Sequence, residues 1–362
     1  MINCDSFRIF SSSAGGVSIL IILLCLLVPR ISIAAEHEKF EGVLMINPGS
    51  ELWRDIRQRD EPSTGISQIR GVDSGILINS QGDRWARFRI ETLVPYGAIA
   101  LTGITLVILL FYMIRGKVRI EGGLSGRMVR RFTDYEKIVH WVLALVFLFL
   151  AITGLILLFG RTLLIPLFGQ ELFSLFASAS KEGHNLFGPI FIVSLLMMLI
   201  SFAKRNIYEK GDLTWLLKGG GLLGKSHVTG GFFNMGEKTW YWMVILVGLI
   251  ISVSGLILVL PNFGQGRVIM ELSHVIHVGA AVILIAVSLG HMYLGSVGSE
   301  GSLEAMKTGY VDFNWIESHH DRWAKECREN NLIVSAEEYA RLQGKAGGDS
   351  AGLTSETVGQ AK

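Results

Sequence analysis

The sequence predicts an all-α integral membrane protein: a four-helix transmembrane bundle, one extra N-terminal transmembrane helix and a small N-terminal extramembrane segment. Half of the 362 residues are hydrophobic and only 18% are charged, which is too apolar for an ordinary soluble surface. Five apolar runs are long enough to cross a hydrocarbon core, which takes about 20 helical residues. The net charge of +2 gives no reason to expect nucleic acid as a partner.

The N-terminal 94 residues precede the first of these runs. Residues 17–28 are apolar but too short to span a bilayer. They are followed by Ser32-Ile33-Ala34-Ala35, a small-residue pattern of the kind that a signal peptidase accepts, so residues 1–35 are predicted to be a secretory signal peptide. Residues 36–94 are polar and carry glycine and proline turn signals. They are predicted to lie outside the membrane.

Basic residues orient the five predicted spans. Seven Lys or Arg residues lie between the first and second runs and six between the third and fourth, whereas the alternate loops hold two and one. Because cytoplasmic loops retain positive charge, the two basic loops and the C-terminus are predicted to be cytoplasmic. Residues 326–362 are predicted to be a disordered cytoplasmic tail. The extra helix covers 95–114, and the bundle helices cover 138–159, 184–203, 240–260 and 274–297.

The bundle helices contain an internal repeat. Trp141 is followed after 13 residues by Gly154, within Thr153-Gly154-Leu155-Ile156-Leu157, and Trp242 is followed at the same step by Gly255, within Ser254-Gly255-Leu256-Ile257-Leu258. The repeat predicts two related helix pairs. Its glycines would let a helix or a flat ligand approach the backbone closely.

Four histidines lie in or at the ends of the apolar runs: His140, His184, His277 and His291. Ionisable groups at membrane depth are unfavourable, so each is a functional candidate. The last two are 14 residues apart on one helix, which is about 21 Å along the axis and about 40° around it. From the predicted orientation, His277 is level with His184 near the outer side, and His291 is level with His140 near the inner side.

Two stacked histidine pairs are typical of two b-type haems, since an iron held by two imidazoles is suited to electron transfer. Zinc would need three or four close ligands, and no such cluster is visible. The three cysteines form no Cys-x-x-Cys motif, which argues against a covalent haem or an iron–sulfur cluster held by this chain alone. His274 remains an alternative to His277 as the outer ligand. His227, His319 and His320 are interpreted as solvated or propionate-pairing residues.

Around these histidines the chain resembles the gamma subunit, the cytochrome b component, of respiratory formate dehydrogenases. The resemblance covers about residues 130–325 and ends near His319-His320-x-Arg322-Trp323. It rests on His140-Trp141, His184 four residues before Gly188, Asp212-x-x-Trp215-Leu216-Leu217, Asn234-x-Gly236-x-Lys238, Ile276-His277 and His291-Met292-Tyr293.

The resemblance implies a multi-pass subunit of the bacterial inner membrane, with residues 36–94 in the periplasm. Its implied partners are a periplasmic iron–sulfur (beta) subunit and a molybdenum or tungsten catalytic (alpha) subunit, so this chain would hold no formate-oxidising centre. Electrons would pass through the outer and then the inner haem to a quinone. By resemblance the quinone site involves Asn234, Gly236 and Glu237, where Glu237 stands in place of the family's common Gln. An interfacial charge pair is the other interpretation of Glu237 and Lys238, and the aromatic residues that follow them, 240–242, suit an interfacial belt.

Other functions are less well supported. The cytochrome b subunit of a hydrogenase or of a thiosulfate or polysulfide reductase could use a similar bundle with another soluble partner. A transporter is disfavoured because the spans contain almost no charged or polar residues apart from the histidines. A redox-silent membrane anchor would lack haem.

Overall fold

The computed structural model describes residues 80–120, 122–218 and 229–343. The predicted signal peptide and residues 36–79 lie outside the described residues. Four helices of the described part are long and apolar enough to cross a membrane: Gly82–Arg115, Asp134–Asn206, Met235–Val259 and Arg267–Gly298. The predicted all-α membrane architecture is therefore confirmed.

The extra N-terminal span is longer than predicted. Helix α3 (Ser80–Arg87), a π-helical segment (Phe88–Leu93) and α4 (Val94–Arg115) follow one another without a break. Residues 80–94, predicted to belong to a polar extramembrane segment, are thus helical. Pro95 directly follows the π-helical segment, in which the Val94 N–H bonds to the backbone oxygen of Arg89, five residues earlier. The helix therefore continues past the proline with a local change in its hydrogen-bond pattern.

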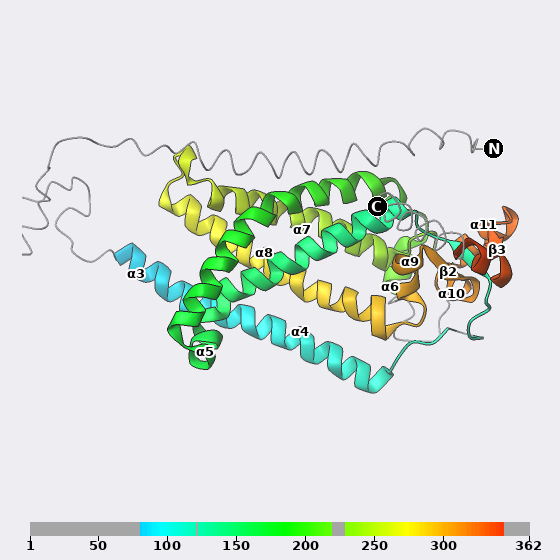
Figure 1. Cartoon of the computed structure of the whole chain (residues 1–362), viewed down its shortest axis with the longest axis horizontal. Coiled ribbons are helices and arrows are strands. Elements are labelled where there is room, and N and C mark those ends of the chain that lie inside the picture. The colour runs from blue at the N-terminus through cyan, green and yellow to red at the C-terminus, as the bar shows by residue number, and fades with distance from the viewer. Residues whose placement is uncertain (1–79, 121, 219–228, 344–362) are drawn as a thin grey trace, which may run out of the picture. The chain divides into compact units, whose positions relative to one another are not determined.

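Helix α5 (Asp134–Phe202) contains two of the predicted spans. The chain reverses at Gly169, whose φ of 80° is accessible to glycine, so α5 is a hairpin of two arms (Figure 1). Phe149 on the first arm packs against Phe187 on the second, with ring centroids 4.4 Å apart. Five crossings are therefore contained in four long helices, and the predicted loop 160–183 is helical apart from Gly169.

Helices α7 (Met235–Val259) and α8 (Arg267–Tyr293) form the second hairpin, joined by the 3-10 turn Pro261–Phe263. Gly248 of α7 lies against Leu195 of α5, which joins the two hairpins. Helix α4 packs on α8, where Tyr293 contacts the rings of Phe111 and Tyr112. We call the end of the bundle with the Gly169 reversal the hairpin end.

The opposite end, here the sheet end, carries a small extramembrane layer (Figure 1). Three antiparallel strands in the order β2-β1-β3 come from the first basic loop and from the C-terminal region. The layer's buried apolar core includes Val311, Phe313, Ile316 and Cys327, each 0% exposed. Its elements are β1 (Met128–Arg130), the 3-10 turn Ala203–Asn206, α6 (Asp212–Leu217), the π-helical turn Leu294–Gly298, α9 (Ser302–Thr308), β2 (Tyr310–Asp312), α10 (Phe313–His319), α11 (Asp321–Glu329) and β3 (Ile333–Val334).

This layer corrects one prediction. Residues 326–343 were predicted to be disordered, but they complete α11, supply β3 and end in a further helical turn. The strands are only two or three residues long, too short for an alternating pattern to predict. The described parts of the two basic loops and the segment after α8 all meet at this end, as the alternation of the predicted spans requires.

Candidate functional site

Both predicted histidine pairs form. At the hairpin end, the rings of His184 and His277 lie with centroids 6.1 Å apart and an interplanar angle of 73°. At the sheet end, the rings of His140 and His291 lie 6.3 Å apart at 60°. Each pair joins one arm of α5 to α8. The four histidines are thus paired in the structure as the 14-residue spacing predicted.

The two hairpin-end histidines have equivalent surroundings. Thr153 Oγ1 lies 2.9 Å from Nδ1 of His184, and Ser254 Oγ lies 3.2 Å from Nδ1 of His277. Cβ atoms placed on the glycines that follow, Gly154 and Gly255, would meet the Cε1 atoms of these rings at 3.3 and 3.1 Å. The internal repeat therefore builds the same histidine pocket twice, and the group that approaches each glycine is the imidazole itself.

The sheet-end pair is surrounded by aromatic rings. Trp240 stacks on His291 with centroids 4.8 Å apart and an interplanar angle of 19°. Trp141 contacts His140 edge-on and donates its indole N–H to the backbone oxygen of Met306 in α9. Trp240 thus faces a candidate ligand, and its place in an interfacial belt stays a prediction.

His274 takes a different position. It forms an edge-to-face contact with Trp85 of α3 at 5.5 Å, and its buried Nε2 has no hydrogen-bond partner among the described residues. His184 faces His277, one turn further along α8. His274 thus joins α8 to the N-terminal helix instead of completing the pair.

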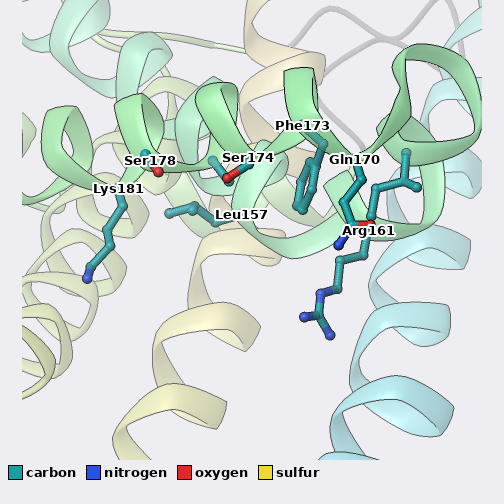
Figure 2. Close-up of a pocket in the computed structure, with 9 residues that line it drawn as sticks. Leu157, Arg161, Gln170, Phe173, Ser174, Ser178 and Lys181 are labelled. Atoms are coloured by element: carbon teal, nitrogen blue, oxygen red, sulfur yellow. The ribbon is translucent and has the colours of Figure 1, made fainter.

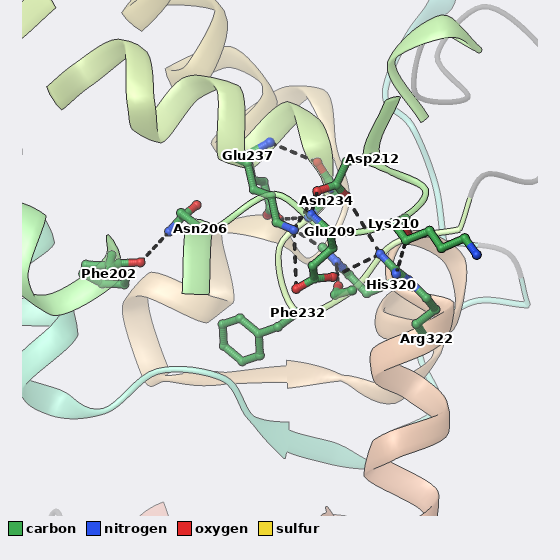
Figure 3. A network of polar contacts seen from close by, with 12 residues as sticks. Phe202, Asn206, Glu209, Lys210, Asp212, Phe232, Asn234, Glu237, His320 and Arg322 are labelled. Carbon is green, nitrogen blue, oxygen red and sulfur yellow. Dashed lines mark hydrogen bonds and ion pairs between the residues drawn. The ribbon is translucent and has the colours of Figure 1, made fainter. Parts of the chain in front are cut away.

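A network of charged and polar side chains lies at the sheet end (Figure 3). Lys238 Nζ lies 2.9 Å from Asp212 Oδ2, and both side chains are 2% exposed. Arg131 Nη2 lies 3.0 Å from the Glu237 carboxylate and donates to the backbone oxygen of Phe232. Glu237 and Lys238 are therefore partners of two other residues, and the prediction that they form a charge pair with each other is wrong.

His320 is the centre of this network and is fully buried, so the prediction of a solvated histidine is wrong. Its Nδ1 lies 2.8 Å from the backbone oxygen of Gly231, and its Nε2 lies 3.7 Å from Glu237. Burial lowers the pKa of His320 to about 4, although the nearby Glu237 carboxylate acts in the opposite direction. His320 is therefore neutral at pH 7. His227 lies outside the described residues.

The three residues of the predicted quinone site begin α7. Asn234 is the N-cap, and its side chain and that of Glu237 bond reciprocally to each other's backbone N–H groups. Gly236 leaves room for Trp215, since a Cβ there would lie 2.7 Å from the indole. These residues therefore have a structural role at the start of α7, one turn before Trp240.

A polar groove opens at the hairpin end, between the two arms of α5 (Figure 2). It has a volume of about 380 Å³, and its lining includes Arg161, Gln170, Ser174 and Lys181. It contains no histidine. Its polar side chains alternate with apolar ones such as Leu157, Ile165 and Phe173. Within the described residues no cluster of three or more metal-binding side chains occurs.

Comparisons with known proteins agree with this geometry. Residues 131–309 match the prokaryotic cytochrome b561 family. This part of the chain is therefore similar to cytochrome b561 domains. The matched region contains all four paired histidines and the reciprocal cap of α7.

The resemblance to formate dehydrogenase cytochrome subunits is also confirmed. The cytochrome b556(Fdn) subunit of the nitrate-inducible formate dehydrogenase of Escherichia coli is 29% identical over 225 residues, which cover 59% of this chain and 98% of the relative. The cytochrome b556(fdo) subunit from the same species is 28% identical, over 55% of this chain and 93% of the relative. The Haemophilus influenzae formate dehydrogenase cytochrome b556 subunit is 25% identical, over 58% and 87%.

The histidine pairs of the matched region fit b-type haem. Imidazole nitrogens lie about 2 Å from a first-row metal, so two rings on opposite sides of one iron have centres about 6 Å apart. The measured 6.1 and 6.3 Å agree with that spacing. At the hairpin end, Nδ1 of each ring lies against a hydroxyl, which leaves Nε2 as the nitrogen that can face iron.

Sequence reasoning missed the residues that hold the sheet end together. Arg131, Asp212 and His320 come from three segments far apart in the chain, and each needs a partner from another segment. A signal was available: Asp212, Lys238 and His320 all lie within the motifs that carried the resemblance. The buried contacts of these three residues explain physically why the motifs contain these residue types.

Proposed function

We propose that this chain is the di-haem cytochrome b subunit of a membrane-bound formate dehydrogenase, which carries electrons from an iron–sulfur subunit through two b haems to quinone. The names of its relatives support the formate dehydrogenase complex, since the match extends over nearly their whole length. The observation that carries the two haems is the presence of two facing histidine pairs at opposite ends of one bundle.

His184 and His277 would hold one haem, and His140 and His291 would hold the other. A haem held by two imidazoles supplies one-electron chemistry and leaves no iron position open to oxygen. The protein contributes the orientation of the four rings and an apolar, water-excluding bundle. On α8 the two ligand levels are about 21 Å apart, which spans most of the hydrocarbon core.

The quinone would bind near the start of α7, beside Asn234, Gly236 and Glu237. Trp240 lies one turn beyond this segment and stacks on His291, so a quinone here would be close to the sheet-end haem. Reduction of a quinone also needs two protons, which a carboxylate at the membrane boundary can relay. Glu237 would have to exchange its contact with Arg131 to do so.

The chain would lie in a bacterial inner membrane with the sheet end in the cytoplasm. The two loops with most of the Lys and Arg residues support this orientation. The hairpin end would then face the periplasm, together with residues 36–94 and the iron–sulfur (beta) and catalytic (alpha) subunits. The haem between His184 and His277 would be the one that accepts electrons from these partners.

The test is reduction of the purified complex. We expect formate-oxidising subunits to co-purify with this chain, and formate to produce reduced b-haem absorption bands. Reduction by hydrogen but not by formate would instead identify the cytochrome of a hydrogenase, and reduction only through a sulfur substrate would identify a thiosulfate or polysulfide reductase. A dithionite-reduced spectrum without b-haem bands would leave a redox-silent anchor.

A further inference from the structure

The two histidine pairs differ in their hydrogen bonds. At the hairpin end, both rings have a hydroxyl at Nδ1, from Thr153 and Ser254. At the sheet end, Nδ1 of His140 is buried and has no hydrogen-bond partner among the described residues. His291 is in contact with the rings of Trp240 and His140. The hairpin-end rings are therefore hydrogen-bonded to hydroxyl oxygens, whereas the sheet-end rings are in contact with aromatic side chains.

The direction of the hairpin-end hydrogen bonds follows from the other contacts of each hydroxyl. Thr153 Oγ1 lies 2.9 Å from the backbone oxygen of Phe149, and Ser254 Oγ lies 2.7 Å from that of Ile250. A hydroxyl has one hydrogen, and a carbonyl oxygen can only accept. Because each hydroxyl donates to the carbonyl, it must accept the Nδ1–H of its histidine. This fixes the tautomer in which Nε2 carries the free lone pair.

Backbone contacts fix the same orientation. Nδ1 of His277 also lies 3.0 Å from the backbone oxygen of Ile251, so its N–H is shared between two acceptors. Gly154 and Gly255 hold the Cε1 edges of the two rings, since a Cβ at either position would be in close contact. Each imidazole is thus held at Nδ1 and at Cε1, and the arrangement occurs twice in the repeat.

We propose that Thr153 and Ser254 are positioning residues for the hairpin-end haem ligands and make this haem the one of lower reduction potential. The proposal rests on the proposed function. An acceptor at Nδ1–H increases the electron donation of a metal-bound imidazole. Stronger donation stabilises ferric over ferrous iron and so lowers the potential. The sheet-end pair lacks these hydroxyls, so one electron passes downhill from the hairpin end to the sheet end, with no bond formed or broken.

The experiment is a redox titration of the purified complex, followed by b-haem absorbance, for wild type, Thr153→Val and Ser254→Ala. We expect two one-electron components in wild type, with the lower one absent from His277→Ala. Both hydroxyl variants should raise the lower midpoint potential and leave the upper one in place. Haem transfer to excess apomyoglobin should also become faster, because losing such an outer partner typically weakens metal binding about 10- to 100-fold.

Matched controls separate hydrogen bonding from packing. Ser252→Ala removes a buried hydroxyl two residues from Ser254 that donates to the backbone oxygen of Gly248 and has no other partner within the described residues. This variant should shift neither potential. Thr153→Ser keeps the hydroxyl and should retain the wild-type potential, even where Thr153→Val releases the haem.

Three results would overturn the proposal: unshifted potentials in Thr153→Val and Ser254→Ala, a shift of the upper component alone, or a Thr153→Ser variant that behaves as Thr153→Val does. A wild-type complex without b haem would instead contradict the proposed function.

Discussion

Asp212→Asn tests the buried ion pair that joins α6 to α7. The substitution keeps the shape of the side chain and an oxygen for the backbone N–H of Glu209, but it removes the charge that compensates Lys238. Removing one partner of a buried pair costs about 3–5 kcal/mol. Glu209 remains 3.5 Å from Lys238 and is 46% exposed, so it offsets part of that loss. We expect a destabilisation of about 2–4 kcal/mol.

Thermal unfolding of the detergent-solubilised protein, followed by circular dichroism, measures this effect. At about 2–4 °C per kcal/mol for a chain of this size, the midpoint should fall by roughly 5–15 °C. Glu304→Gln is the matched control, because its pair with Lys307 is exposed and its loss should cost less than about 1 kcal/mol. The double variant Asp212→Asn with Lys238→Met removes both charges and should recover much of the loss. A midpoint for Asp212→Asn equal to that of Glu304→Gln would refute the reasoning.

Three further predictions concern the sheet end. Burial lowers the pKa of His320 from 6.5 to about 4. Between these two pH values the unfolded chain binds a proton that the folded chain does not. The free energy of unfolding should therefore fall by about 3 kcal/mol as the pH decreases from about 6.5 towards 4. In His320→Gln the thermal midpoint should depend less steeply on pH between pH 4 and 7. A pH dependence equal to that of the wild type would show that another group causes the effect. Arg131→Lys should lower the thermal midpoint by the equivalent of about 2 kcal/mol, because a lysine cannot reproduce the guanidinium contacts with both Glu237 and the Phe232 oxygen; a wild-type midpoint would contradict this. Burial raises the pKa of the Cys327 thiol to about 11. Maleimide should therefore label Cys327 at pH 7.5 only after denaturation, which peptide mass spectrometry can measure. Rapid labelling of the native protein would contradict its burial.

The spans and the histidine pairs could be predicted from the sequence because both depend on simple spacing. Apolar runs of about 20 residues define membrane crossings without any tertiary information. Two histidines 14 residues apart on one helix share a face by helix geometry alone. His184 and His140 could then be matched to them by depth, once the basic loops had set the direction of each span.

The sheet end could not be predicted in this way because it depends on contacts between distant segments. Arg131 meets Glu237 across 106 residues and His320 across 189. In sequence, these residues look like solvated charges in loops and a tail. Only the folded layer, with strands of two or three residues, shows that they are buried and paired.

Haem content of single His→Ala variants tests the central claim most directly. Pyridine haemochromogen assays of the purified protein should give two haems per chain for wild type and for His274→Ala. Each of His184→Ala, His277→Ala, His140→Ala and His291→Ala should give one, with members of a pair losing the same spectral component. Two haems retained in His277→Ala together with one lost in His274→Ala, or a wild-type protein with a single haem, would contradict the account.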